Sequence, residues 1–274
     1  MEPLLKWPGG KRWIAEELGL LYKRLQNKGV NGITEPFAGG ASISFVVEPE
    51  NVQLNDIISP LTDLYSEIKA NDSFSLSGIN ILNTEDNYLK NREIFNQNIK
   101  SGTTEKNPAL FYYMNRTGYR GMVRFNKLGE FNISFGNYAK PILLDDFSAY
   151  HQFLKRAEIT NGCFQELKVK QSHMIFSDPP YDDGWVGYSE NGFDMNKQTQ
   201  HAHWLASHKN PIVTTNKATP RIVSLYKSLG FTVKTYSARR SISAKKNSGE
   251  KVKEMIAFLN IKPSDIKKIC FLDD

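Results

Sequence analysis

Apolar residues recur along the chain with two different spacings. Short runs of Ile, Val, Leu and Phe between polar or glycine residues are typical of buried strands. Longer stretches in which apolar residues return every three or four positions predict helices, as with Ile14, Leu18 and Leu21. The two kinds of segment alternate, so the sequence predicts an α/β fold. Strands are expected from residue 33, at 52–56, at 158–162, at 173–176, at 211–215, at 231–236 and at 254–259.

Two further helices can be delimited from their ends or their composition. Ser59-Pro60 predicts a helix start, with serine as the cap and proline at the first helical position. Residues 194–208 predict another helix. Its His201 and His203 lie on different faces and lack a metal-ligand partner set, so we interpret them as structural or solvent-exposed.

The pattern changes between residues 58 and 148. Strand-like runs disappear there and polar residues become frequent, which predicts a mainly helical insert. The expected organisation is a discontinuous α/β core at 1–57 and 149–261, the insert at 58–148, and a polar C-terminal tail at 262–274. Residues 184–192 contain glycine and tyrosine and are a candidate flap over a site.

Composition limits the class of protein. The chain has 274 residues, enough to bury a full core, and its 40% hydrophobic and 23% charged content is ordinary for a soluble globular protein. No apolar run is long enough to span a membrane, and the first residues lack a signal-peptide pattern. Two cysteines, Cys163 and Cys270, form neither a disulfide framework nor a zinc-ligand set, so we expect a cytoplasmic protein. The net charge of +6 permits a polyanionic partner without requiring one.

The clearest chemical signal is Asp178-Pro179-Pro180-Tyr181, which follows the strand expected at 173–176. In open α/β sheets, ligands bind at the carboxyl ends of the strands. A planar exocyclic amine needs acceptors for two hydrogens; Asp178 supplies one, and a carbonyl stiffened by the prolines supplies the other. Tyr181 offers a flat face for stacking. The motif therefore suits methylation of a base amino group, although a plain proline-rich turn explains it equally well when it is taken alone.

Two glycine-containing segments precede predicted helices. The segment 37–40 lies between a strand and a helix, and Asp56 ends the next strand about twenty residues later. In nucleotide-binding βαβ units such an acid accepts hydrogen bonds from ribose hydroxyls; a generic βαβ unit with a surface acid is the alternative. Gly-Gly-Lys at 9–11 suggests anion binding at a helix N-terminus, but an ordinary turn is favoured for that segment alone.

The insert contains a basic and aromatic segment at 111–132, in which Arg, Lys and Asn alternate with rings. Cationic side chains hold phosphates or read guanine edges, and rings stack on bases or wedge between them. This composition favours nucleic-acid binding over a helical lobe with a solvated basic face. The loop at 239–251 begins with two arginines and could lie along phosphates, although an isolated run of charge is usually only solvated.

Taken together, these motifs resemble the Dam-type DNA adenine-N6 methyltransferases of the D12 class. They follow the order of the branch with the cofactor motif first, the DNA-reading insert next and Asp-Pro-Pro-Tyr last. The matching segments are 5–11, 35–40, 55–56, 115–132, 135–136, 178–181 and 239–243. The resemblance covers nearly the whole chain. It implies a Rossmann-like methyltransferase core that uses S-adenosylmethionine, with an inserted, mainly helical DNA-recognition subdomain.

The resemblance also implies residue roles. The implied catalytic residues are Asp178, Pro179, Pro180 and Tyr181. The implied cofactor pocket is lined by Trp7, Lys11, Phe37, Gly39, Asp56 and Asp178. The candidate DNA contacts are Lys6, Arg116, Tyr119, Arg120, Met122, Arg124, Asn126, Arg239 and Arg240. The implied reaction is direct methyl transfer to an adenine flipped out of double-stranded DNA, within GATC in many members. We expect no metal and a monomer when the protein is free.

Two residues depart from the family pattern. Ala41 stands where the glycine turn usually ends in glycine; alanine is tolerated there if φ is negative and is costly if φ is positive. Arg120 stands where GATC-type members commonly have asparagine. Asparagine suits adenine edges and arginine suits guanine, so either the target differs or Arg120 holds a phosphate.

Alternative functions stay open at this point. One is an enzyme that methylates RNA or a protein amide with the same motif; the basic and aromatic insert disfavours the protein substrate. The other is a DNA-binding subunit of a defence system or a retron-like element that keeps the fold with little catalysis. The intact acid and ring of the motif, Asp178 and Tyr181, argue against this second alternative.

Overall fold

The computed structural model describes residues 1–181, 193–239, 251–267 and 269. Its strands are β1 (Gly32–Glu35), β2 (Asn51–Asp56), β3 (Ala157–Asn161), β4 (His173–Ser177), β5 (Ile212–Lys217), β6 (Thr232–Arg239) and β7 (Lys251–Leu259). Its α-helices are α1 (Arg12–Gln26), α2 (Ser42–Val47), α3 (Ser59–Ala70), α4 (Glu85–Ser101), α5 (Asn107–Thr117), α6 (Ser148–Leu154), α7 (Met195–Ala206), α8 (Pro220–Ser228) and α9 (Pro263–Ile266). Short 3-10 turns are η1 (Tyr119–Gly121) and η2 (Phe164–Glu166).

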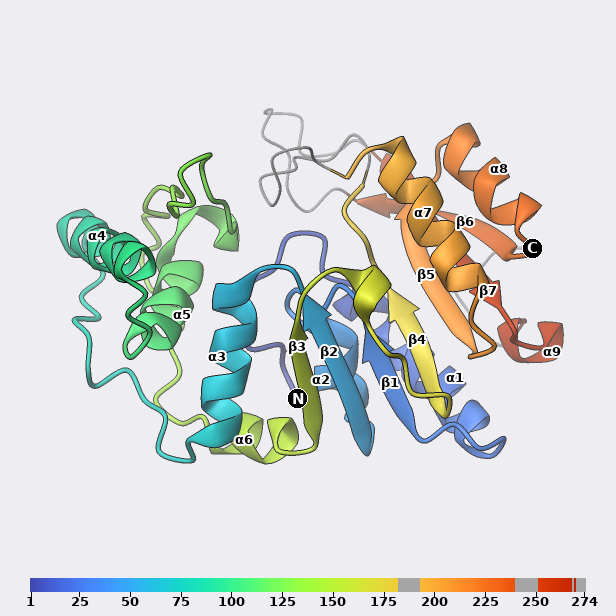
Figure 1. The fold of residues 1–274 in the computed structure, drawn as a ribbon, viewed down its shortest axis with the longest axis horizontal. Helices are drawn as coiled ribbons and strands as arrows, with labels where there is room; N and C mark the ends of the chain where they lie inside the picture. Colours follow the sequence, from blue (N-terminus) through green and yellow to red (C-terminus); the bar gives the residue numbers. More distant parts are fainter. Residues whose placement is uncertain (182–192, 240–250, 268, 270–274) are drawn as a thin grey trace.

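Within the described residues, the strands form one seven-stranded sheet in the order β3-β2-β1-β4-β5-β7-β6 (Figure 1). Strands β1 to β5 pair in parallel, and β7 runs antiparallel between β5 and β6. The chain order reverses at β1, which has β2 on one side and β4 on the other. A crevice at the carboxyl ends of such neighbouring strands is the usual ligand site of open α/β sheets. The predicted α/β fold is confirmed.

The strands alternate their side chains between two layers of helices. In β4, Met174 and Phe176 pack with α1, whereas Ile175 between them packs with α7 and α8. The same alternation runs through β7 at 255–258. Helices α1 and α9 therefore cover one face of the sheet, while α7 and α8 cover the other (Figure 1). Burial on both faces explains why the central strands read as nearly continuous apolar runs.

The residues of the predicted insert lie largely beyond the β3 edge of the sheet, where α4 and α5 stand apart from the strands (Figure 1). Helix α3 links the two regions, because Leu64 belongs to the same buried cluster as Val52 of β2 and Phe95 of α4. Among the described residues from 57 to 156, only isolated bridges occur, Gly118 with Phe135 and Phe125 with Phe131. One continuous core thus supports both regions.

Two local features differ from expectation. Ser59 is not the cap of α3: Ile58 holds that position, and Asp56 Oδ1 accepts its backbone N–H at 3.1 Å. The residues predicted to begin a polar tail form α9, and the Ile266 and Ile269 side chains are buried in the cluster around α1. Two apolar residues three positions apart form a small buried face. They stand among mostly polar residues, so the sequence pattern predicts a tail and not a buried helix.

Candidate active site

The glycine turn after β1 is built to receive a tryptophan. Gly39 has φ +48°, and a Cβ placed on it would lie 2.6 Å from Trp7 Nε1. A Cβ on Gly40 would lie 2.9 Å from Trp7 Cβ. Both glycines are therefore required by the close approach of the Trp7 side chain. The structure thus brings together Trp7 and the glycine turn, which lie about thirty residues apart in the sequence.

Asp56, at the carboxyl end of β2, supports the same turn. Its Oδ2 accepts the Gly39 N–H at 2.9 Å, while the Tyr65 hydroxyl donates to Gly39 O at 2.7 Å. Burial raises the pKa of Asp56 to about 6, although hydrogen bonds from the backbone N–H groups of Gly39, Ile58 and Ile57 act to lower it. Each carboxylate oxygen has a second lone pair, so the bonds within the protein leave capacity for a ligand hydroxyl.

Glu35, at the end of β1, is a functional-site candidate that sequence reasoning did not single out. Its Oε1 accepts the Ser44 N–H at the start of α2, at 2.9 Å. Burial, with a smaller contribution from the negative charge of Asp178, raises the pKa of Glu35 to about 7 against the hydrogen bonds from Ser44. Strands β1 and β4 pair in parallel, with Thr34 opposite Ile175, so Glu35 and Asp178 lie at the same edge of the sheet.

Asp178 follows β4 and is held from two sides. Lys11 Nζ donates to its Oδ2 at 2.9 Å, and Thr215 Oγ1 of β5 donates to its Oδ1 at 2.7 Å. The Lys11 side chain is only 3% exposed and also donates to Gly9 O at 2.7 Å. Asp178 is 21% exposed, so one part of this carboxyl still faces solvent.

The rest of the motif is held as firmly. Gln198 Nε2 of α7 donates to Pro180 O at 2.8 Å, and the Tyr181 hydroxyl donates to Glu254 Oε2 of β7 at 3.2 Å. Burial, followed by the charges of Asp178 and Glu254, raises the pKa of Tyr181 well above its usual value. The phenol therefore stays protonated and remains a donor. Tyr181 also lies beside Lys11, whose Nζ is 5.3 Å from the ring centroid.

Phe37 belongs to an aromatic cluster between the glycine turn and α7. Its ring centroid lies 5.3 Å from that of Phe164, 5.5 Å from that of Phe193 and 5.2 Å from that of His201. Phe37 stays partly exposed, so its ring can contact a flat ligand. His201 is fully buried, with Nε2 2.8 Å from Ser177 Oγ, which confirms the structural interpretation of this histidine.

The predicted DNA-reading turn is fastened to the N-terminal segment by a buried asparagine. Asn115 Nδ2 donates to Lys6 O at 2.8 Å and to Gly121 O at 3.0 Å, and its Oδ1 accepts the Lys6 N–H at 2.9 Å. On this support the turn presents Tyr119 and Arg120, both exposed. The Arg120 guanidinium lies 5.2 Å from the Tyr119 ring centroid.

Other predicted DNA contacts are engaged within the protein. Lys6 Nζ donates to Arg116 O at 3.2 Å and lies 3.8 Å from the Tyr138 ring centroid. Burial, together with the charge of Arg116, lowers the pKa of Lys6. Arg124 donates to Asn132 through both Nε and Nη2. Met122 is half-buried in the same region.

Two more predicted contacts take part in local structure. Arg116 Nε donates to Ile142 O at 2.8 Å. Asn126 closes a turn, because its Oδ1 accepts the Glu130 N–H at 3.0 Å. Arg239 ends β6, whereas Arg240 and the candidate flap lie outside the described residues.

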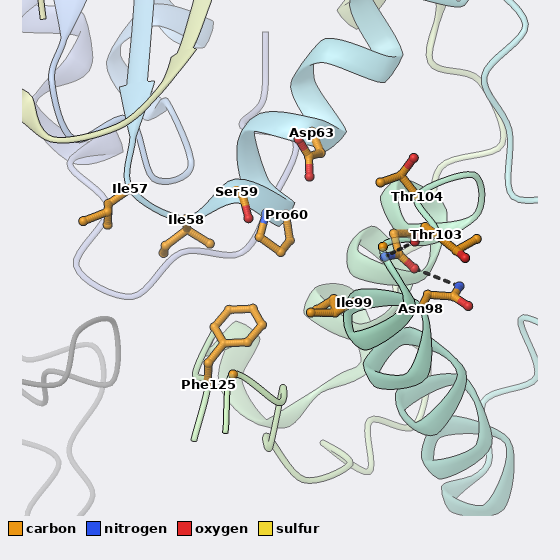
Figure 2. Close-up of a pocket in the computed structure, with 13 residues that line it drawn as sticks. Ile57, Ile58, Ser59, Pro60, Asp63, Asn98, Ile99, Thr103, Thr104 and Phe125 are labelled. Atoms are coloured by element: carbon orange, nitrogen blue, oxygen red, sulfur yellow. Dashed lines mark hydrogen bonds between the residues drawn. The ribbon is translucent and has the colours of Figure 1, made fainter. Parts of the chain in front are cut away.

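A cavity of about 340 Å³ has no residue of the Asp-Pro-Pro-Tyr motif in its lining (Figure 2). Figure 2 shows it between the first turn of α3, the end of α4 and Phe125, with Ile57, Ile58 and Ile99 around it. Its lining residues include neither Lys nor Arg. We interpret it as a packing gap between α3 and α4, because its lining comes mainly from the facing ends of these two helices and from Phe125.

Comparison with known proteins decides the family. The profile of the D12 class N6 adenine-specific DNA methyltransferases matches residues 7–242. The chain belongs to this family. It is 32% identical to the retron Ec67 DNA adenine methylase of Escherichia coli, over 94% of this chain and 91% of that protein. It is 30% identical to the DNA adenine methylase of Escherichia coli strain K12, over 92% of this chain and 93% of that protein.

A solved structure of a putative RNA methyltransferase from Pyrococcus horikoshii also resembles the chain, with a TM-score of 0.47 and 10% identity over 96% of this chain and 91% of that one. At that level the likeness says nothing about substrate. The D12-class enzyme described here transfers a methyl group from S-adenosylmethionine to N6 of adenine in DNA.

The residues around the glycine turn fit this cofactor. Lys11 pairs with Asp178, and two further buried carboxyls, those of Glu35 and Asp56, lie at the carboxyl ends of the neighbouring strands β1 and β2. This excess of negative charge suits a cationic sulfonium, and the partly exposed ring of Phe37 suits an adenine. No group of three His, Cys, Asp or Glu side chains is placed to hold a metal in the part of the chain that the structure describes. No described helix has both the length and the apolar character needed to cross a bilayer.

Proposed function

We propose that this D12-class methyltransferase acts on an adenine extruded from double-stranded DNA, which Asp178, Pro179 and Tyr181 hold. The observation that carries the proposal is the convergence at the carboxyl ends of β1 and β4. The acid of the motif lies beside Lys11 of the N-terminal segment, and the parallel pairing of β1 with β4 places Glu35 at the same edge of the sheet. Extrusion costs a few kcal/mol, and stacking on the Tyr181 ring offsets part of that cost.

In this proposal Asp178 accepts one N6 hydrogen and the Pro179 carbonyl accepts the other. Lys11 and Thr215 fix the carboxylate without using all its lone pairs. Orienting both hydrogens aims the nitrogen lone pair at the methyl donor, which is a gain of alignment and electrostatics. The proton that N6 loses passes to Asp178, whose partial exposure allows its release to solvent.

S-adenosylmethionine, when bound, supplies an electrophilic methyl group on a cationic sulfur. The residues proposed to hold it are Trp7, Lys11, Phe37, Gly39, Asp56 and Asp178. Asp56 is placed to accept from ribose hydroxyls, and Phe37 offers its ring face. Trp7 acts indirectly, because its indole keeps the two glycines of the turn in their close-approach geometry.

For the DNA side we propose that η1 reads the target and that residues 58–148 act as the recognition insert of a core at 1–57 and 149–261. Tyr119 and Arg120 are exposed on the turn, and Lys6 and Arg124 lie beside it. The loop that begins at Arg239 is proposed to follow phosphates. We propose a GATC target, a free monomer and action inside the cell, by analogy with the adenine methylases of Escherichia coli.

The test is transfer of a radiolabelled methyl group to duplexes containing GATC, to matched duplexes in which one base pair of GATC beside the target adenine is changed, and to RNA of the same sequence. We expect labelled N6-methyladenine in the GATC duplex alone. Equal labelling of the RNA contradicts the DNA proposal, and equal labelling of the altered duplexes contradicts the GATC target. Methylation-sensitive sequencing of DNA from expressing cells then identifies the sequence that is modified.

A further inference from the structure

Two buried amides lie behind the Asp-Pro-Pro-Tyr motif. Gln198 of α7 and Asn216 of β5 are both fully buried. Asn216 Nδ2 donates to Gln198 Oε1 at 2.9 Å, and Gln198 Nε2 donates to Pro180 O at 2.8 Å. The Asn216 Oδ1 in turn accepts the backbone N–H of Lys217 at 2.8 Å.

These hydrogen bonds form a relay with a single direction. It begins at the Lys217 N–H, which can only donate, and ends at the Pro180 carbonyl, which can only accept. If either amide flipped, two acceptors or two donors would face each other in a site without solvent, at a cost of the order of 1–3 kcal/mol. The ends therefore fix how both amides point.

We propose that Gln198 and Asn216 are positioning residues for methyl transfer: they occupy the Pro180 carbonyl and so direct the target amine to the Pro179 carbonyl. The inference rests on the proposed role of the motif. Two proline carbonyls follow each other there, and a rigid amine site needs only one besides Asp178. The hydrogen bond from Gln198 fixes the Pro180 carbonyl. Because φ of proline is already restricted, this also sets the orientation of the preceding peptide group, which carries the Pro179 carbonyl.

The change that tests the relay is Gln198→Glu, which keeps the size of the side chain. As a carboxylate, the new residue still accepts from Asn216 but faces Pro180 O with a second acceptor. As a neutral acid it donates to Pro180 O again. The variant should therefore lose activity at high pH and regain it relative to wild type as pH falls.

The buried titratable groups near Gln198 cannot produce the same gain of activity at low pH. Burial lowers the pKa of His201 on α7 to about 3 and raises the pKa of Tyr226 on α8. Neither changes charge between pH 6 and 8. Glu35, whose pKa burial raises to about 7, titrates in both proteins, so its effect cancels in the ratio of variant to wild type at each pH.

The experiment measures single-turnover methyl transfer to a duplex, together with the affinities for S-adenosylmethionine and for DNA, from pH 6 to pH 8. For Gln198→Glu we expect kcat to fall on the order of 10- to 100-fold at pH 8, with both affinities within about threefold of wild type, and the deficit to shrink toward pH 6. Gln198→Met removes both polar atoms and should lose kcat without recovery at low pH.

Asn210→Asp is the matched control. Asn210 is also a buried amide, but its Nδ2 donates to His173 O at 2.8 Å, at the opposite end of β4. This variant should lose stability while keeping wild-type kcat.

Wild-type kcat in Gln198→Glu at pH 8 overturns the relay, as does a loss that Asn210→Asp reproduces or that persists unchanged at pH 6. If Gln198→Glu does not fold, Gln198→Met decides: wild-type kcat overturns the proposal and a selective loss supports it. Failure of wild type itself to label adenine in duplex DNA overturns the proposed function instead.

Discussion

The two regions proposed to act on DNA, the Asp-Pro-Pro-Tyr motif and the turn at η1, are held in opposite ways. At the Asp-Pro-Pro-Tyr motif, each functional group is itself bound: Asp178 by Lys11 and Thr215, and Tyr181 by Glu254. At the proposed recognition turn the backbone is fastened through Asn115, while Tyr119 and Arg120 remain exposed. Chemistry on one amine needs fixed groups within a fraction of an ångström, whereas reading DNA needs side chains that adapt to bases and phosphates. The comparison predicts where single substitutions act on catalysis and where they act on sequence choice.

Asp178→Ala should give the largest effect. It removes the proposed acceptor for N6, so kcat should fall by about 10²- to 10³-fold or more, while duplex DNA is still bound. The change also leaves Lys11 buried without its counterion, which destabilises the fold by about 3–5 kcal/mol. Single-turnover methylation, DNA binding and urea unfolding separate these outcomes.

A charge-balanced control sharpens this result. Asp178→Asn combined with Lys11→Met removes both charges, so stability should recover although methyl transfer stays lost. Activity near wild type in either variant would remove Asp178 from the mechanism.

Asn115→Ala should act on the other region. It deletes three hydrogen bonds that join Lys6 and Gly121, at a cost of about 2–3 kcal/mol. We expect discrimination between GATC and altered duplexes to fall about tenfold, with little change in cofactor affinity, because the turn loses its fixed position. Competition between labelled duplexes measures the discrimination.

Asn91→Ala is the control for that change. Asn91 is also buried in the helical region, where its Nδ2 donates to Asn80 O at 2.7 Å. Its loss should lower stability but leave discrimination intact. If both variants lost discrimination equally, the fastening by Asn115 would have no special role.

The pH dependence of cofactor binding tests the acids beneath the glycine turn. Burial raises the pKa of Glu35 to about 7 and that of Asp56 to about 6, so both gain negative charge between pH 5.5 and pH 8. A cation binds the ionised forms better. The preference for S-adenosylmethionine over its neutral-sulfur product should therefore increase, by about fivefold, as pH rises through this window, and calorimetry measures both affinities.

Stability should change in the opposite sense. A carboxyl whose pKa is raised on folding contributes stability that is present below its unfolded pKa and is lost as pH rises through the folded value. Relative to wild type, Glu35→Gln should thus become more stable as pH rises through about 7, and its cofactor preference should depend less on pH. Parallel curves for the two proteins would show that Glu35 does not titrate in this range.

Individual residues show how far the sequence could predict this arrangement. The strands, the helix stripe of α1 and the placement of Asp56 and Asp178 at strand ends follow from local periodicity, because one buried face imposes one spacing. Glu254 and Gln198 carry no local signal. They reach the motif only through the antiparallel register of β7 and the packing of α7, which are properties of the whole fold. Thr215 ends the strand predicted at 211–215. Because the carboxyl ends of neighbouring parallel strands lie at one edge of a sheet, its contact with Asp178 could have been predicted.

The smallest expected effect concerns Ala41, whose φ of +46° is the strained alternative that the sequence left open. Ala41→Gly relieves the steric cost of the left-handed conformation, about 1–2 kcal/mol in an L-residue. Glycine also loses more backbone entropy on folding than alanine, which costs about 0.5–1 kcal/mol. The change deletes a buried methyl group worth about 0.8 kcal/mol as well. These terms nearly cancel, so unfolding free energy should shift by less than about 1 kcal/mol. Ala41→Val, which puts a branched side chain at the same φ, should cost more than about 2 kcal/mol. A gain in unfolding free energy above about 2 kcal/mol for Ala41→Gly would mean that the backbone strain at Ala41 is larger than this estimate, and that packing around the turn maintains it.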